Sequence, residues 1–503
     1  MNKLKSTLVL SFFGIGTVFA QERPNIIVFL VDDLGWNDTS LAMSGEPTEY
    51  NKRYKTPNLE KLADKGMILT NAHAQPLCVP SRASLLSGQN FINHNVIGDY
   101  DCTFTKKKDI LIPPGDIFNP RYALPQIVRE AGYRTIHVGK YHLSEHVSKF
   151  PTPETSGFDV NIAGSNFGAP GSYYAKDNYS RGKNIMHDLE GYAKKGMHLT
   201  DALTDTAKAE ISKSVAMKKP FFMYLAHYAI HRPLQKHAPY DREYHLQKGE
   251  DIGESYYASL IEGVDHSLGS VMDHLKKLKI DDNTIIIFFG DNGGLVMYRK
   301  KRCLYGGHQF NYPLRSGKAS LYEGGIRVPA VVSWPSKRTS SGISNAPVMI
   351  EDIYPTVLAA AGAKVPKEYS VDGMDLSHLV KTGKAKRQRK HRSMCFHFPY
   401  RFVGTVMCGK DFTIEEVNIG AAIIKDGWKL IYHQYDEHFA LYNLNEDIGE
   451  EHNIIDSHMG RALDLAKILE SKFSQYKPTV AVRVDEQRRV SSPMEAFTKN
   501  YNL

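Results

Sequence analysis

The chain has 503 residues, of which 42% are hydrophobic and 23% charged, and its formal net charge is +8 at pH 7. This composition is that of an ordinary globular protein and excludes a disordered chain. The length predicts two or three domains, or one large α/β domain with a smaller companion, and the positive charge favours an anionic partner.

Residues 1–20 have the features of a secretory signal peptide. Lys3 and Lys5 precede an apolar run, and the small residues Val18 and Ala20 precede the expected cleavage point. The run is too short for a membrane span, and no later segment approaches the ~20 uninterrupted apolar residues that a span needs. We therefore expect an exported protein, periplasmic or secreted, without a membrane span.

Strand-like and helix-like segments alternate after Pro24. The strand-like runs are NIIVFLV, YRTIHVG, PFFMYLA and NTIIIFFG, and the helix-like segments between them include PNLEKLADKG, LPQIVREAG and SYYASLIEGVDHSLGSVMDHLKKL. Such alternation predicts an α/β domain with a large, doubly wound, mostly parallel sheet flanked by helices, which we assign to residues 24–380. Polar residues follow each strand, and ligands bind at that edge of a parallel sheet.

Four further segments complete the expected organisation. Residues 155–215 are rich in Gly, Asn, Tyr and charge, and we expect a long loop insertion there with substrate contacts. The basic run at 381–393 is either a solvated loop between domains or an electrostatic guide for a polyanion. Residues 394–480 predict a smaller α+β domain on an antiparallel sheet, and residues 481–503 a C-terminal tail.

Two strand ends carry side chains suited to a metal ion. Asp32 and Asp33 end one strand, and Asp291 and Asn292 end another. Four oxygen ligands without His or Cys favour a hard divalent cation such as Ca²⁺ or Mg²⁺ rather than zinc. The alternative is that these residues serve only in turns.

The stretch AQPLCVPSRASLLSGQ predicts a helix that begins beside Cys78. Pro80 suits a first helical position and Gly88 suits the end of the helix. Cys78 would then lie just before the helix N-terminus, where backbone N–H groups favour an anion or a thiolate, and Arg82 adds a positive charge. The alternative is a disulfide cysteine beside an ordinary capped helix.

The chain has five cysteines, and an odd number leaves one thiol unpaired in an oxidising compartment. If Cys78 is the unpaired one, the others could form two disulfides, although the sequence does not say whether they do. These others are Cys102, Cys303, Cys395 and Cys408.

Six segments, in order along the chain, match motifs of one enzyme family. Cys78-Val79-Pro80-Ser81-Arg82 resembles the C-x-P-x-R motif of the formylglycine-dependent (type I) sulfatases, in the alkaline phosphatase superfamily. The resemblance runs from about residue 24 to 335, and LYNLNEDIGEEHN resembles the family's C-terminal domain. The other matching segments are Asp32-Asp33, Gly139-Lys140-Tyr141-His142, His231 in HRP, Asp291-Asn292-Gly293, and Gly317 to Gly325 with Lys318.

The resemblance implies a function for each matched residue. Cys78 would be oxidised to formylglycine by a formylglycine-generating enzyme, and would be a precursor rather than the nucleophile itself. Ca²⁺ would contact this residue and a sulfate oxygen, and would activate the attacking hydroxyl. The implied metal ligands are Asp32, Asp33, Asp291 and Asn292 together with the modified Cys78, and the implied sulfate-binding residues are Arg82, Lys140 and Lys318.

The implied acid and base are histidines. By resemblance, His231 would protonate the bridging oxygen of the ester, with Lys318 beside it, and His142 would deprotonate the second hydroxyl of the formylglycine hydrate so that sulfate leaves. His308 lies ten residues before Lys318 and is a further candidate for substrate contact. Two positions depart from the family pattern: Tyr141 replaces a tryptophan, and Gln89 replaces a basic residue.

The expected function is the hydrolysis of sulfate esters by an exported enzyme that acts on a sulfated carbohydrate and not on nucleic acid. One alternative is a phosphodiesterase or phosphonate hydrolase of the same superfamily. The other is a non-catalytic protein that binds sulfated glycans, although Cys78, His142, His231 and Lys318 would then have no purpose.

Overall fold

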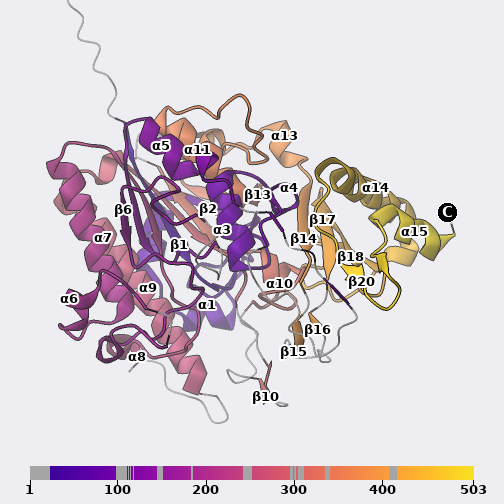
Figure 1. Ribbon diagram of the computed structural model, residues 1–503, viewed down its shortest axis with the longest axis horizontal. Coiled ribbons are helices and arrows are strands. Elements are labelled where there is room, and N and C mark those ends of the chain that lie inside the picture. Colours follow the sequence, from indigo (N-terminus) through magenta and orange to yellow (C-terminus); the bar gives the residue numbers. More distant parts are fainter. Residues whose placement is uncertain are drawn as a thin grey trace, which may run out of the picture.

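The structure, a computed structural model, has a larger part that contains an extensive sheet and a smaller C-terminal part beside it (Figure 1). The residues that it describes are 23–97, 110–111, 113, 115–116, 118–143, 151–182, 185–241, 252–294, 298–299, 302–303, 311–334, 340–400, 402–406, 416–417 and 419–502. Among them, no helix has both the length and the apolar character needed to cross a membrane.

The larger part is built on an eight-stranded sheet with the order β12-β2-β11-β8-β1-β7-β5-β6. Within this sheet as described, β11 alone runs antiparallel to its neighbours, so the prediction of a mostly parallel sheet is confirmed. The strands are β1 (Asn25–Val31), β2 (Gly66–Leu69), β5 (Arg134–Gly139), β6 (Val160–Ile162), β7 (Phe221–Ala226), β8 (Thr284–Gly290), β11 (Ala330–Ser333) and β12 (Gly342–Ser344).

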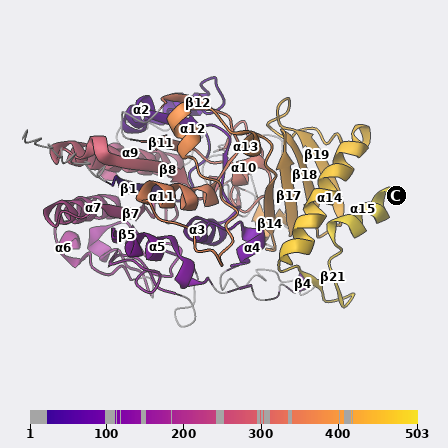
Figure 2. The same ribbon diagram turned by 90° about the horizontal axis from the view of Figure 1, so that it is seen from above.

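Helices cover both faces of this sheet (Figure 2). Alternate residues of β1 enter two separate cores, because successive side chains of a strand point to opposite faces: Ile26 and Val28 pack in one core, and Ile27 and Phe29 in the other. The first core includes α3 (Cys78–Ser87), α5 (Leu124–Glu130) and α11 (Ile353–Ala361), and the second includes α2 (Pro57–Asp64), α7 (Leu199–Ala216) and α9 (Ile252–Lys277).

The smaller part is an antiparallel sheet with helices against it, as the sequence predicts. Its order is β14-β17-β18-β19, and Asp426 and Gly427 form the turn between β17 and β18. The elements are β14 (Met394–Phe398), β17 (Gly420–Lys425), β18 (Trp428–His433), β19 (His438–Asn443) and α14 (Met459–Tyr476). The segment expected as a tail carries β20 (Val482–Arg483), β21 (Arg488–Arg489) and α15 (Pro493–Tyr501), and α15 packs against α14.

Shorter elements lie in the connections between these parts. The helices are α1 (Glu49–Arg53), α4 (Phe91–His94), α6 (Glu190–Ala193), α8 (Ala238–Asp241), α10 (Glu323–Ile326), α12 (Ser377–Thr382) and α13 (Arg387–Lys390). The strands are β3 (Ala72–His73), β4 (Ile110–Leu111), β9 (Tyr298–Arg299), β10 (Arg302–Cys303), β13 (Val348–Met349), β15 (Phe402–Val406) and β16 (Glu416–Val417).

The prediction of one long loop over 155–215 is wrong in two places, since residues 160–162 form β6 of the large sheet and the last part of the range is helical. Residues from Leu199 onward form α7, an 18-residue helix. Leu203, Ala207 and Ile211 recur at helical spacing and are fully buried in the core under the sheet. The many Thr, Ser, Asp and Lys residues between them hide this short apolar stripe in the sequence.

The basic run at 381–393 is only partly a solvated loop. Arg389 is 3% exposed, and its Nη1 lies 2.6 Å from Asp352 Oδ2. Arg392 Nη1 lies 2.6 Å from the same oxygen. These two arginines are therefore tied to the larger part of the molecule, whereas Lys386 and Arg387 are exposed.

Candidate active site

The polar residues at the strand ends meet at one edge of the sheet. Strands β1 and β8 are parallel and Val31 pairs with Gly290, so Asp33 and Asp291 follow them at adjacent places. The backbone N–H of Asp33 donates to Asp291 Oδ1 over 3.2 Å. This is the carboxyl edge, where ligands bind in open α/β sheets.

Three buried carboxylates and the Cys78 thiol form a compact cluster at this edge. Ligand atoms from Asp32, Asp33, Cys78 and Asp291 all lie within 4.8 Å of one another. Asn292 Nδ2 donates to Asp33 Oδ1 over 2.8 Å, but neither Asn292 Oδ1 nor Asp33 Oδ2 has a hydrogen-bond partner. Buried oxygens rarely lack partners, so these two atoms fit a cation, and an oxygen-rich donor set suits a hard divalent ion.

Three cations surround the carboxylates. Arg82 Nη2 lies 2.7 Å from Asp291 Oδ2, and Lys140 Nζ lies 2.5 Å from Asp32 Oδ2. Lys318 Nζ donates to Asp33 Oδ1 over 2.5 Å and contacts Cys78 Sγ at 3.3 Å. The cluster therefore has three acidic and three basic side chains.

Lys318 reaches this edge because β11 is reversed. Residues that precede a parallel strand lie at the opposite edge of the sheet, but residues that precede β11 lie at the carboxyl edge of β8. The N–H of Lys318 donates to Gly294 O over 3.0 Å. This bond holds the backbone of Lys318 close to Asp291 and Asn292, which just precede Gly294 in the chain. Because β11 is antiparallel, Lys318 reaches the site although it precedes its strand, whereas Asp32 and Asp291 follow theirs.

The structure places Cys78 within α3 rather than just before it. Cys78 is the first residue of the helix, Pro80 is the third, and Gly88 ends the helix with φ +71°, as predicted. Burial, reinforced by Asp32, raises the pKa of the Cys78 thiol to about 12. Burial and the neighbouring carboxylates thus outweigh the helix N-terminus, which by itself would favour a thiolate.

The two candidate histidines lie at the same site. His231 Nε2 is 3.7 Å from Asp33 Oδ2, and its Nδ1 donates to the carbonyl of Arg232 over 2.9 Å. His142 has φ +48° and donates its backbone N–H to Ser165 O over 3.1 Å. Burial and nearby lysines hold the pKa of both imidazoles well below the ordinary value, so both are neutral at pH 7.

Two supporting residues were missed in the sequence, and both belong to the segment expected to be a loop. Tyr173 OH donates to the carbonyls of Tyr228 and His231, over 2.7 and 2.8 Å, and so holds the turn that carries His231. Gly168 lies against the ring of His142 so closely that a Cβ would be 2.5 Å from its Cε1. Neither residue stands in a motif that could have identified it.

The remaining candidates have different outcomes. His308 lies outside the described residues, as do Cys102, Cys408 and the side chain of Cys303. Cys395 is a free and buried thiol, so a scheme that pairs all four of the other cysteines is excluded. Its burial among apolar residues of the smaller part explains why it can remain reduced.

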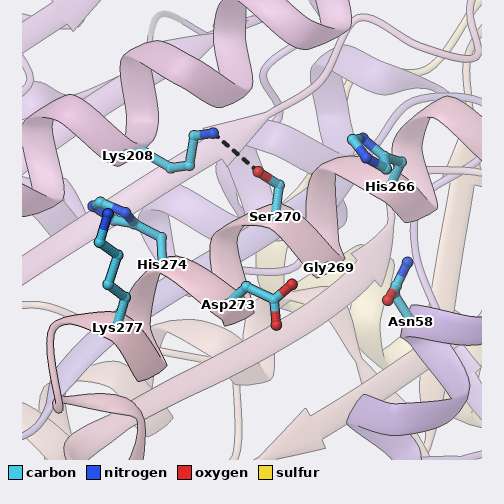
Figure 3. Close-up of a pocket in the computed structure, with 8 residues that line it drawn as sticks. All are labelled: Asn58, Lys208, His266, Gly269, Ser270, Asp273, His274 and Lys277. Carbon is cyan, nitrogen blue, oxygen red and sulfur yellow. Dashed lines mark hydrogen bonds between the residues drawn. The ribbon is translucent and has the colours of Figure 1, made fainter.

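A hollow of about 340 Å³, apart from the carboxylate cluster, lies between α2, α7 and α9 (Figure 3). Three of its side chains have hydrogen bonds: Lys208 Nζ donates to Ser270 Oγ over 3.0 Å, and His274 Nε2 lies 2.8 Å from Ser212 Oγ. None of the candidate site residues lines it. We therefore assign the chemistry to the carboxyl edge of the sheet.

Comparison with known proteins identifies the family of the chain. The model of the sulfatase family matches residues 24–363, and that of the N-sulphoglucosamine sulphohydrolase C-terminal region matches residues 316–478. The N-acetylgalactosamine-6-sulfatase of Canis lupus familiaris is 32% identical over 386 residues, which are 73% of this chain and 68% of that protein. A sulfatase of Formosa agariphila is 28% identical over 90% of this chain and 88% of its own length.

Solved structures show the same fold. The crystal structure of Ps i-CgsB in complex with k-i-k-neocarrahexaose has a TM-score of 0.69 and 26% sequence identity, and the match covers 95% of this chain and 97% of that one. The structure of BT4656 in complex with its substrate D-glucosamine-2-N,6-O-disulfate has a TM-score of 0.65 at 20% identity. With a family match over most of its length and an acidic, lysine-lined site, the chain belongs to the sulfatase family and is a sulfuric ester hydrolase.

Proposed function

We propose that this enzyme removes sulfate from a carbohydrate outside the cytoplasm, and that it uses formylglycine made from Cys78 and a bound calcium ion. The observation that carries the proposal is the state of Cys78. Its thiol is 2% exposed, has a raised pKa and lies among three carboxylates, so it is a poor nucleophile as encoded. Oxidation to an aldehyde, whose hydrate offers hydroxyl groups, would give this position a chemical purpose.

The carbohydrate substrate is supported by relatives. The canine relative is named for N-acetylgalactosamine 6-sulfate chemistry, and the Ps i-CgsB crystal contains a neocarrahexaose. The predicted signal peptide at residues 1–20 supports export, where such glycans are met.

A calcium ion would be held by Asp32, Asp33, Asp291 and Asn292. Two buried oxygens among them lack hydrogen bonds, and carboxylate and amide oxygens are the ligands that Ca²⁺ prefers. Bound there, the ion would lower the pKa of a hydroxyl at position 78 and neutralise charge on the sulfate. Mg²⁺ fits less well because it demands a near-ideal octahedral shell and tends to keep its waters.

The charged side chains of the chain would bind and orient the sulfate. The three carboxylates and three cations balance, so a divalent ion leaves the site with a positive charge that complements an anionic ester. Arg82 is engaged with Asp291 through two nitrogens and orients that carboxylate. Lys140 and Lys318 have mobile ammonium groups that can turn from the carboxylates to sulfate oxygens once a metal ion takes their place.

His231 is the proposed proton donor to the oxygen of the leaving alcohol. Its imidazole is neutral in the free site because burial and Lys318 lower its pKa. A bound sulfate ester would bring negative charge against the ring and favour the protonated form. His142, also neutral, can accept a proton from a hydroxyl at position 78.

The test of the proposed modification is peptide mass spectrometry of the segment that contains Cys78, on protein from the organism that makes it. Conversion of the thiol to the aldehyde lowers the mass by about 18 Da, because one sulfur and two hydrogens are lost and one oxygen is gained. An unmodified thiol in catalytically active protein would refute the proposal. The Cys78→Ala variant, purified in parallel, provides the control for the assignment of the peptide.

Removal of metal should lower both activity and thermal stability. Chelation leaves three buried carboxylates without a divalent partner, and added Ca²⁺ at about 100 times its Kd should restore about 2.7 kcal/mol. In Asn292→Ala the rise in Tm with Ca²⁺ should be smaller, because one ligand oxygen is gone. Thermal denaturation at graded Ca²⁺ or Mg²⁺ measures both effects, and a Tm that does not respond to Ca²⁺ would contradict the assignment.

A further inference from the structure

The smaller part of the molecule inserts a lysine into a buried charge cluster of the larger part. Lys429, on β18, has no exposed surface, and its Nζ lies 3.0 Å from Glu323 Oε1 and 2.8 Å from Glu450 Oε1. Glu323, in α10, also lies 3.0 Å from His73 Nε2 and 3.1 Å from Arg327 Nη1. Two acidic side chains, Glu323 and Glu450, and two basic ones, Lys429 and Arg327, therefore lie together in a buried cluster.

A second contact from the smaller part fixes the backbone around Glu323. Glu450 Oε2 accepts the N–H of Glu323 over 2.6 Å, and the carbonyl of Glu450 accepts from Arg315 Nη1 over 3.0 Å. The carbonyl of Arg315 in turn accepts the N–H of Gly324 over 3.0 Å. Residues 315–326 are thus closed into a compact segment whose outer side is bound to Lys429 and Glu450.

The inner side of the same segment forms part of the active site. Ala319 donates its N–H to Pro76 O over 2.8 Å, next to the helix of Cys78, and Gly293 donates to Gly325 O over 3.0 Å. There is no free space at this second contact, because a Cβ on Gly293 would lie 1.8 Å from Gly324 O. A shift of the segment would therefore move Lys318, whose Nζ is placed at 3.3 Å from Cys78 Sγ.

We propose that Lys429 and Glu450 are positioning residues, which hold segment 315–326 so that Lys318 points at the sulfate site. The inference rests on the role proposed above for Lys318. It makes the C-terminal part of the chain a component of the active site, although no described residue of that part is among the sulfate-binding candidates. Glu323 and Glu450 are fully buried, so water cannot replace Lys429 as the partner of their carboxylates. Loss of this partner would leave buried charges uncompensated, which is why the contact can hold the segment in place.

The test compares Lys429→Met and Glu450→Gln with a matched control. Arg134→Met removes another largely buried ion pair, with Glu210, at the amino end of β5 and so at the opposite edge of the sheet. Small displacements of a catalytic group can cost up to ~10²-fold in rate, so we expect kcat to fall ~10- to 100-fold in Lys429→Met and less in Glu450→Gln. The KM for an aryl sulfate should change little, and Arg134→Met should keep its kcat.

A double-mutant cycle with Lys318→Ala separates positioning from general stability. If Lys429 acts through Lys318, Lys429→Met should cost almost nothing further in the Lys318→Ala background. An equal loss in both backgrounds would overturn the proposal. Glu450→Gln, which keeps a neutral acceptor of the same shape, serves for the cycle if Lys429→Met does not fold.

Hydrogen exchange of the amides in 315–326 gives a readout that does not need activity. Lys429→Met should speed exchange in this segment selectively, whereas Arg134→Met should not. Unchanged exchange in the segment would overturn the positioning role. If the wild-type enzyme cleaves no sulfate ester while the selective exchange is observed, the proposed function fails and the structural link between the two parts stands.

Discussion

Several residues of the site adopt backbone conformations that few side chains tolerate. Asp33 has φ +60° and His142 has φ +48°, and Gly139, two residues before Tyr141, has φ +101°. Non-glycine residues in this region cost of order 1 to 3 kcal/mol each and persist where the surroundings fix them, often at functional sites. The concentration of such residues beside Asp32 and Lys140 agrees with a site whose geometry is set before substrate binds.

The Gly168→Ala substitution tests how closely His142 is held. The added Cβ would meet the imidazole at 2.5 Å, so the ring must move, and we expect kcat to fall by ~10-fold while Tm changes little. Gly191→Ala is the matched control, because its Cβ would meet no atom within 4 Å. Steady-state kinetics on an aryl sulfate measures kcat for both variants. Equal kcat values would show that His142 can move without loss of activity, and would contradict the prediction.

The sequence predicts the residues of the site better than it predicts their support. Asp32, Asp291 and Cys78 stand in motifs or at strand ends, so their meeting could be anticipated from the parallel sheet. Tyr173 could not be anticipated, because its contact with the carbonyl of His231 depends on how residues 163–182 fold back. The burial of the Cys78 thiol could not be anticipated either, since burial cannot be read from a local motif.

At the scale of elements, helix α2 depends on a carboxylate supplied by another helix. The side chain of Thr56, at the N-cap position, bonds to Ser40 and not to an N–H of the helix. Asp265 of α9 instead accepts the N–H of Leu59 over 2.8 Å and that of Asn58 over 3.1 Å. An acidic group at a helix N-terminus satisfies free N–H groups and the helix dipole. This contact joins two helices that lie about 200 residues apart in sequence.

Asp265 should make stability depend on pH. Burial raises its pKa from 3.8 to about 6, so the folded state holds the proton more tightly than the unfolded state does. The free energy of unfolding of the wild type, relative to Asp265→Asn, should therefore fall as pH rises from 3.8 to about 6, by ~3 kcal/mol at most. Denaturation at a series of pH values measures this difference, and parallel profiles for the two proteins would contradict it.

At the scale of the whole molecule, the exposed part of the basic run can guide a polyanionic substrate. Lys386, Arg387 and Lys390 are exposed, whereas Arg389 is bound to Asp352 and should be left intact. Replacing the three exposed residues by Gln should raise KM for a sulfated polymer and spare a small aryl sulfate.

The control for this variant is the removal of three positive charges at the C-terminal end of α9. Lys276, Lys277 and Lys279 are exposed and precede β8, so they lie toward the amino edge of the sheet. Their replacement by Gln should leave both KM values unchanged. Added salt should reduce the difference in KM for the polymer between the wild type and the variant of the basic run, because charges are screened over ~8 Å at physiological ionic strength. Equal effects of the two triple variants would rule out a guiding role.

The fold class and both sheets could be predicted from alternating strand and helix patterns, but the relation between the two parts could not. Lys429 stands in an ordinary strand, WKLIYH, and nothing local indicates that it is fully buried against Glu323. Contacts of this kind depend on the final packing of segments distant in sequence. The same holds for α7, whose apolar stripe is visible only against the core that it covers.

The central place of β1 has a consequence for synthesis of the chain. Asn25 bonds to Phe221, 196 residues later, and to Thr284, 259 residues later, so the first strand made is among the last to be paired on both edges. At about 5 to 20 residues per second, a ribosome needs roughly 10 to 50 s to supply both neighbours. During that time NIIVFLV is an apolar, uncharged strand with two open edges, which is the signature of an aggregation-prone segment. Yields of soluble protein should therefore depend on chaperones that hold the nascent N-terminal region until residue 290 has been made.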